Sequence, residues 1–86
     1  MQVDYHRRFI KEHKKLHPKI REAFQDRLKI FLIDKFNPIL DNHQLAGEYA
    51  GCRSINITGN YRSIFIESGE YIKFLRINTH HELYGK

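Results

Sequence analysis

Apolar residues recur every three or four positions through the first part of the chain, a spacing typical of α-helices. The pattern predicts a first helix over residues 7–16 and a second over residues 19–35. Pro18 suits the first turn of the second helix, and Asn37-Pro38 ends it. The second helix has the stronger apolar stripe and is expected to supply half of the core: Ile20, Phe24, Leu28, Phe31, Leu32 and Phe36.

The hydrophobic period changes to two after Gly51, which is typical of strands. Ile55 and Ile57 then share one face, with polar residues between them. The turn signals Gly59-Asn60 and Ser68-Gly69 separate three predicted strands. These strands cover residues 52–58, 61–67 and 71–78, and alternation also predicts a short edge strand over residues 2–5.

The predicted elements define an α+β fold. It consists of an N-terminal strand, two helices and then a three-stranded antiparallel meander, with residues 38–51 as a connecting loop. Both helices are expected to cover one sheet face, because nothing else can bury the isoleucines of the first meander strand. The other face stays open. A chain of 86 residues has room for one modest core, so we expect a single domain over residues 1–86.

The charge of the chain is uneven. Fifteen Lys and Arg residues against ten acidic residues give a net charge of +5. Residues 1–36 hold ten of the basic and five of the acidic residues, so the excess lies in the helical part. A basic helical part fits a polyanionic partner, although a solvated lysine-rich helix face has the same composition.

Composition also excludes several classes of function. The single cysteine, Cys52, cannot form an internal disulfide or a thiolate cluster. No paired Cys/His spacing predicts a metal site, and no glycine-rich loop predicts a bound nucleotide or another cofactor. No signal peptide or membrane-spanning stretch is visible, so the expected location is the cytoplasm.

The C-terminal stretch carries the first candidate chemistry. Thr79 followed by Glu82 is spaced as a capping box, so a helical turn is expected to begin there. His80 and Tyr84 are four residues apart and share one side of that turn. An imidazole beside a phenol in a small basic protein suggests proton transfer on an RNA phosphodiester. The alternative is a surface turn whose polar residues have no chemical role, and His81 points away in either case.

RNA cleavage without a metal needs a base for the 2′-hydroxyl, a cation for the phosphorane charge and an acid for the 5′ leaving oxygen. Arg62 follows the first hairpin turn and faces either a phosphate or water. His43 lies in a loop that two leucines pin to the core, where it faces either the site or solvent. Arg53 shares a face with the buried isoleucines of its strand, so it either packs at the core edge or contacts RNA.

Four loose motifs follow one another through the second half of the chain: Leu40-x-x-His43-x-Leu45-x-Gly47, Gly51-x-Arg53-Ser54-Ile55-x-Ile57, Gly59-Asn60-Tyr61-Arg62 and Thr79-His80-x-x-Leu83-Tyr84-Gly85. In this order and spacing they resemble the RelE/YafQ branch of the RelE/ParE toxin superfamily. The resemblance implies the toxin of a type II toxin–antitoxin system, an mRNA endoribonuclease (mRNA interferase) that needs neither metal nor cofactor. Its implied partners are a labile antitoxin protein, mRNA and ribosomal RNA.

The resemblance also assigns roles to individual residues. His43 and His80 fall where YafQ-like toxins have catalytic histidines, Arg62 falls on a phosphate-binding arginine, and Tyr84 falls on the terminal aromatic. His43 would act as the base and His80 or Tyr84 as the acid, and the two histidines could exchange roles.

Two positions depart from the YafQ pattern. Asn56 stands where that branch has a further histidine, and Asn60 stands where it has an aspartate. Asparagine does not exchange protons near neutral pH, so these residues would at most donate hydrogen bonds to RNA. The remaining RNA contacts are expected from Arg53 and from the basic residues of the first helix, Lys11, Lys14 and Lys15.

Two other functions are compatible with the same fold. A ParE-like member would inhibit DNA gyrase and would not need His43, Arg62, His80 and Tyr84 together. A catalytically weakened toxin would persist as an antitoxin-binding or DNA-autoregulating partner, and Asn56 and Asn60 favour this alternative.

Overall fold

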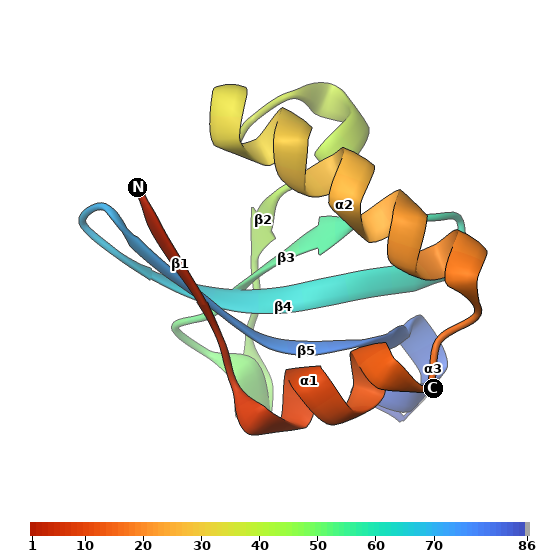
Figure 1. Cartoon of the computed structure of the whole chain (residues 1–86). Helices are drawn as coiled ribbons and strands as arrows, with labels where there is room; N and C mark the ends of the chain where they lie inside the picture. Colours follow the sequence, from red (N-terminus) through yellow and green to blue (C-terminus); the bar gives the residue numbers. More distant parts are fainter. Residues whose placement is uncertain (86) are drawn as a thin grey trace.

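The computed structural model describes residues 1–85 and contains ten elements along the chain (Figure 1). They are β1 (Gln2–Tyr5), α1 (Arg7–Lys14), α2 (Pro18–Ile33), the 3-10 turn η1 (Pro38–Leu40), β2 (His43–Gln44), the 3-10 turn η2 (Gly47–Tyr49), β3 (Arg53–Asn56), β4 (Tyr61–Ser68), β5 (Tyr71–Thr79) and α3 (His80–Tyr84). The order of elements confirms the predicted α+β class.

The sheet has five strands in the order β1-β5-β4-β3-β2, one more than the edge strand and three-stranded meander that the sequence predicted. The predicted meander is present, because β3, β4 and β5 pair antiparallel in succession. At one edge β1 pairs parallel to β5, with Gln2 opposite Tyr71, and at the other edge β2 pairs antiparallel to β3. The segment predicted as a loop therefore holds a strand of two residues, which is too short to show alternation.

The two helices begin at histidine caps and end earlier than predicted. Nδ1 of His6 accepts a hydrogen bond from the Arg8 amide at 3.0 Å, and Nδ1 of His17 accepts one from the Lys19 amide at 3.1 Å. Helix α2 ends at Ile33 because Asp34 adopts an extended backbone conformation. The end of the predicted apolar stripe is consequently exposed, by 46% at Leu32 and 58% at Phe36.

Both helices pack into one core on the same face of the sheet, as expected. Phe9 of α1 and Phe24 of α2 contact each other at 5.2 Å between ring centroids. Phe31 meets Phe65 of β4 edge to face at 5.1 Å, and Phe74 of β5 contacts rings from both helices. This interlocked aromatic cluster fixes the sheet against α1 and α2.

The second sheet face is partly covered, contrary to the expectation that it stays open. Ile64 and Phe65 are consecutive and both fully buried, and a register shift lies between them. Phe65 belongs to the main core and Ile64 lies outside it. Helix α3 packs on β5, with Leu83 buried, so the C-terminal turn shields part of this face.

Within residues 1–85, no helix has the length and apolar character needed to cross a membrane.

Candidate functional site

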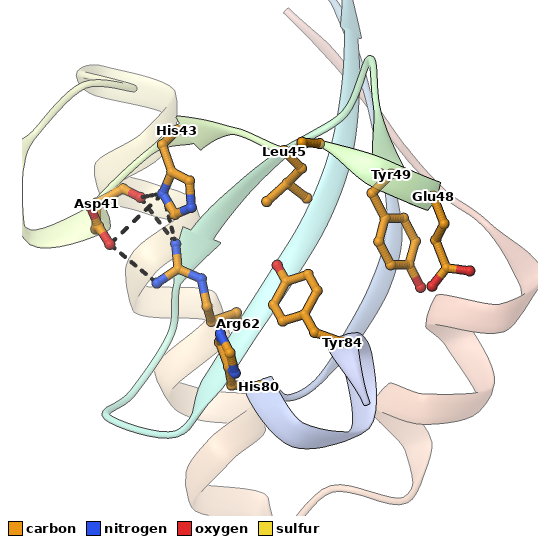
Figure 2. Close-up of a pocket in the computed structure, with 10 residues that line it drawn as sticks. Asp41, His43, Leu45, Glu48, Tyr49, Arg62, His80 and Tyr84 are labelled. Atoms are coloured by element: carbon orange, nitrogen blue, oxygen red, sulfur yellow. Dashed lines mark hydrogen bonds and ion pairs between the residues drawn. The ribbon is translucent and has the colours of Figure 1, made fainter. Parts of the chain in front are cut away.

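A cleft of about 710 Å³ lies between the segment that carries β2 and η2, strand β4 and helix α3 (Figure 2). All four residues predicted to be catalytic line it: His43, Arg62, His80 and Tyr84. They come from three different elements, and the antiparallel pairing of β3 with β4 and β4 with β5 brings them together. Their catalytic roles remain predictions, and their convergence shows where those roles would be carried out.

Arg62 is held in place by partners on every nitrogen of its guanidinium. Nε donates to the Oγ of buried Ser54 at 2.9 Å, and Nη2 donates to the Asp41 carbonyl at 3.0 Å. Nη1 lies 3.4 Å from the Asp41 carboxylate. The Arg62 side chain is only 12% exposed. A cation fixed in this way keeps its orientation when a phosphate approaches the cleft.

The Nδ1 atom of His43 lies 2.8 Å from the Asp41 carbonyl and 3.4 Å from Nη2 of Arg62. Only an Nδ1–H can bond to a carbonyl oxygen, so the shorter contact assigns the proton to Nδ1. In the neutral tautomer with its proton on Nδ1, the free lone pair is on Nε2. Because the side chain is 48% exposed, a substrate can reach that nitrogen.

Helix α3 aligns the third and fourth candidate residues, as the capping-box spacing predicted. The Oγ1 of Thr79 accepts a hydrogen bond from the Glu82 amide at 3.2 Å, and the His80 amide donates to the Asn60 carbonyl at 3.0 Å. The rings of His80 and Tyr84 lie 4.6 Å apart, edge to face. The Tyr84 hydroxyl oxygen is buried and has no hydrogen-bond partner among residues 1–85.

Arg53, predicted to contact RNA, is engaged in holding the loop that leads to His43. Its Nε donates to the Oδ1 of Asn42 at 2.8 Å, and its guanidinium lies 5.5 Å from the ring centre of Phe36. Asn42 in turn donates to the Lys35 carbonyl at 2.9 Å. Asn42 stands between Asp41 and His43, so these bonds restrain both.

The other residues predicted to contact RNA lie outside the cleft. Asn56 is the partner of Arg62 in the pairing of β3 with β4. Asn60 lines a neighbouring hollow with Thr79, His80 and His81. The predicted lysines are exposed on or just after α1: Lys11, Lys14 and Lys15. Their role in RNA binding remains a prediction.

Sequence reasoning missed Asp41 and Tyr49, which both line the cleft. Asp41 is the only residue other than glycine with a positive φ, 47°, among residues 1–85. Asparagine and aspartate tolerate this conformation better than other residues that carry a Cβ, and here it turns the Asp41 carbonyl toward both His43 and Arg62. A local signal for Asp41 existed, since it follows a Pro-initiated turn, whereas nothing in the sequence marks Tyr49.

A buried ion pair lies behind the cleft. The Glu12 carboxylate accepts bonds from Nε and Nη2 of Arg76 at 2.9 and 2.6 Å. Burial opposes the negative charge of Glu12, but hydrogen bonds from Arg76, Asn78 and the Ile77 amide outweigh it, and the Glu12 pKa lies below its ordinary value. The hydrogen bond to Glu12 is also the main reason that the Arg76 pKa is raised.

No cluster of three His, Cys, Asp or Glu side chains suited to a metal ion occurs within residues 1–85.

The mixed sheet, the two helices on one face and the short C-terminal helix form a fold that this chain shares with solved structures of toxins. The chain matches the structure of E. coli YafQ (strain BL21(DE3)) with a TM-score of 0.82 and 19% identity over 98% of both chains. It matches a chain of the E. coli DinJ–YafQ toxin–antitoxin complex with a TM-score of 0.78 and 20% identity, over 98% of this chain and 97% of that chain.

A chain of the RelB–RelE antitoxin–toxin complex from Methanococcus jannaschii is similar to it with a TM-score of 0.76 and 24% identity over 96% of both chains. No family model and no curated protein matches the sequence. The structural similarity therefore extends over nearly the whole chain although sequence identity is only 19–24%.

Proposed function

We propose that this protein is the toxin of a type II toxin–antitoxin pair and that it cleaves mRNA without a metal ion. The observation that carries the proposal is the cleft itself. One fixed guanidinium, one imidazole with a free Nε2, and a second imidazole beside a phenol surround a single open space. These are the groups that cleavage by the neighbouring 2′-hydroxyl requires.

In the proposed reaction, His43 Nε2 takes the proton of the 2′-hydroxyl as that oxygen attacks phosphorus. Arg62 stabilises the charge that builds up on the non-bridging phosphate oxygens. The P–O5′ bond breaks, and His80 or Tyr84 donates a proton to the departing 5′ oxygen; for Tyr84, RNA binding would first have to expose the hydroxyl, which is buried in the free protein. The products are a 2′,3′-cyclic phosphate and a 5′-hydroxyl. The opposite assignment of base and acid to His43 and His80 uses the same geometry.

The positive charge of residues 1–36 supports the proposal that this protein binds RNA. Ten of the fifteen Lys and Arg residues lie in residues 1–36. Three of them, Lys11, Lys14 and Lys15, are exposed at the end of α1. Phosphate contacts of this kind supply affinity without base specificity, which suits ribosomal RNA as the surface that delivers mRNA to the cleft.

A protein antitoxin is the proposed second partner. Two of the similar structures are described as toxin–antitoxin complexes. A net charge of +5 favours an acidic partner, which would bind as an extended helix or strand and close the cleft.

The test is expression of the chain in a cell-free translation system followed by mapping of the mRNA ends. We expect wild-type protein to generate new ends within translated codons, bearing the 5′-hydroxyls that attack by the 2′-hydroxyl produces. His80→Ala and Arg62→Ala should abolish these ends. The ribosome requirement is tested by repeating the assay on purified mRNA.

Other outcomes identify the alternatives. Intact mRNA together with blocked DNA supercoiling by gyrase would indicate a ParE-like inhibitor. Intact mRNA and normal supercoiling would indicate a weakened toxin, for which Asn56 and Asn60 are the departures from the YafQ pattern. Either result contradicts the proposed endoribonuclease.

A further inference from the structure

Tyr49 belongs both to the lining of the cleft and to the hydrogen-bond network of the buried Glu12–Arg76 ion pair. Its side chain lines the cleft from the η2 turn. Its hydroxyl accepts a hydrogen bond from Nη1 of Arg76 at 2.8 Å. The ring of Tyr49 meets the ring of Tyr84 edge to face at 6.1 Å.

Arg76 is well suited to anchor a neighbouring side chain. It is 7% exposed, and Glu12 holds Nε and Nη2 in a two-point contact. The same carboxylate accepts bonds from the Ile77 amide at 3.1 Å and from Asn78 at 3.0 Å. The two bonds to Glu12 therefore fix the position of Nη1 of Arg76, and Nη1 donates its hydrogen bond to Tyr49 at the cleft.

The rings continue this chain of contacts to the candidate site. Tyr84 lies between Tyr49 and His80, with ring distances of 6.1 and 4.6 Å. The Tyr84 hydroxyl has no hydrogen-bond partner among residues 1–85, so no polar contact within that part of the chain fixes its ring. Tyr84 packs against two aromatic rings, those of Tyr49 and His80, and Tyr49 is the one that is anchored by a hydrogen bond.

We infer that Tyr49 is a positioning residue for the site. Arg76 and Glu12 hold its ring, and its ring holds Tyr84 and, through Tyr84, His80. The inference rests on the proposed function for its kinetic consequence, but the positioning itself is a property of the folded chain and can be measured without a substrate.

The decisive variant is Tyr49→Phe, because it keeps the ring and removes only the bond to Arg76. A hydroxyl bonded to a charged group contributes enough to orientation that we expect kcat for mRNA cleavage on translating ribosomes to fall about tenfold. KM should stay within about twofold, because a ring that only stacks on RNA is still present. Tyr71 begins β5, at the end of the strand away from α3. Tyr71→Phe therefore removes a hydroxyl far from the cleft and should leave kcat and KM unchanged.

A second measurement follows the histidine directly. In NMR spectra of the free protein, the ring signals of Tyr84 and His80 should shift in Tyr49→Phe and should not shift in Tyr71→Phe. Glu12→Gln, which weakens the hold on Arg76, should shift the same signals in the same direction. This readout distinguishes positioning from a loss of overall stability, because all spectra are recorded on folded protein.

The outcomes separate this inference from the proposed function. Wild-type protein that does not cleave mRNA contradicts the endoribonuclease, and the NMR comparison still tests Tyr49. Cleavage that is lost in Arg62→Ala but is normal in Tyr49→Phe, with unchanged Tyr84 and His80 signals, would overturn the positioning role. A raised KM with normal kcat would also overturn it, since that result describes a residue that binds RNA.

Discussion

The guanidinium of Arg62 is bound to the backbone of Asp41, whose carbonyl accepts a hydrogen bond from Nη2 at 3.0 Å. The Asp41 carboxylate lies 3.4 Å from Nη1, and the same carbonyl lies 2.8 Å from Nδ1 of His43. One residue in a left-handed conformation thus orients both the proposed phosphate-binding cation and the proposed base. It also places a negative charge next to the position where a phosphate would bind.

Replacement of Arg62 by lysine should lower the rate of mRNA cleavage by about a hundredfold, although the charge is kept. A single ammonium group cannot bond to Ser54, to the Asp41 carbonyl and to a phosphate in a fixed geometry. Single-turnover cleavage on translating ribosomes measures the effect. Arg7→Lys, on the exposed surface of α1, is the control for the change of side-chain type and should cleave as wild type does. Normal cleavage by Arg62→Lys would show that mRNA cleavage does not require a planar guanidinium held in a fixed orientation.

Asp41→Asn should strengthen RNA binding about threefold, because it removes the negative charge beside Arg62 and keeps a residue that tolerates positive φ. The KM for mRNA cleavage is the quantity to compare. Asp41→Val is the contrasting variant. A branched side chain at φ 47° should cost about 1–2 kcal/mol of folding free energy in urea denaturation. An unchanged or higher KM for Asp41→Asn would mean that the carboxylate does not oppose phosphate binding.

The adjacent histidines of α3 form a matched pair for mutagenesis. His80 lines the cleft and contacts Tyr84, whereas His81 is exposed and does not line the cleft. His80→Ala should lower cleavage by about a hundredfold, the contribution typical of a positioned acid or base. His81→Ala should have an effect within about twofold. Equal losses in the two variants would point to a general effect on α3, which the melting temperatures of the two proteins would reveal.

The Glu12–Arg76 pair should make the stability of the protein depend on pH. Because the folded-state pKa of Glu12 is lowered, its contribution is present above the ordinary glutamate pKa of 4.5 and is lost as the pH falls through the folded value. Urea denaturation from neutral pH downward should therefore show a loss of stability in wild type that is smaller in Glu12→Gln.

Glu12→Ala leaves Arg76 buried without its partner and should cost about 3 kcal/mol at neutral pH. Glu70→Ala, whose side chain is 91% exposed, is the control and should cost little. The same acid-induced loss in wild type and Glu12→Gln would assign the pH dependence to other groups.

The local elements were predictable from the chain because they depend on neighbouring residues. The apolar stripe of α2, the burial of Ile55 and Ile57, and the Thr79 cap with its Glu82 amide each reflect spacing along the sequence. The grouping of His43, Arg62, His80 and Tyr84 could also be anticipated, from a resemblance whose motifs carry these residues in order.

Only the tertiary structure revealed how these groups are held. The parallel pairing of β1 with β5, the addition of β2, and the contacts of Asp41, Arg53 and Tyr49 join residues far apart in the chain. The bond from Arg76 to Tyr49 and the bonds from Arg76 to Glu12 show the reason most clearly. A buried charge must find a partner wherever the fold brings one, and no local pattern of residue types specifies which partner that will be.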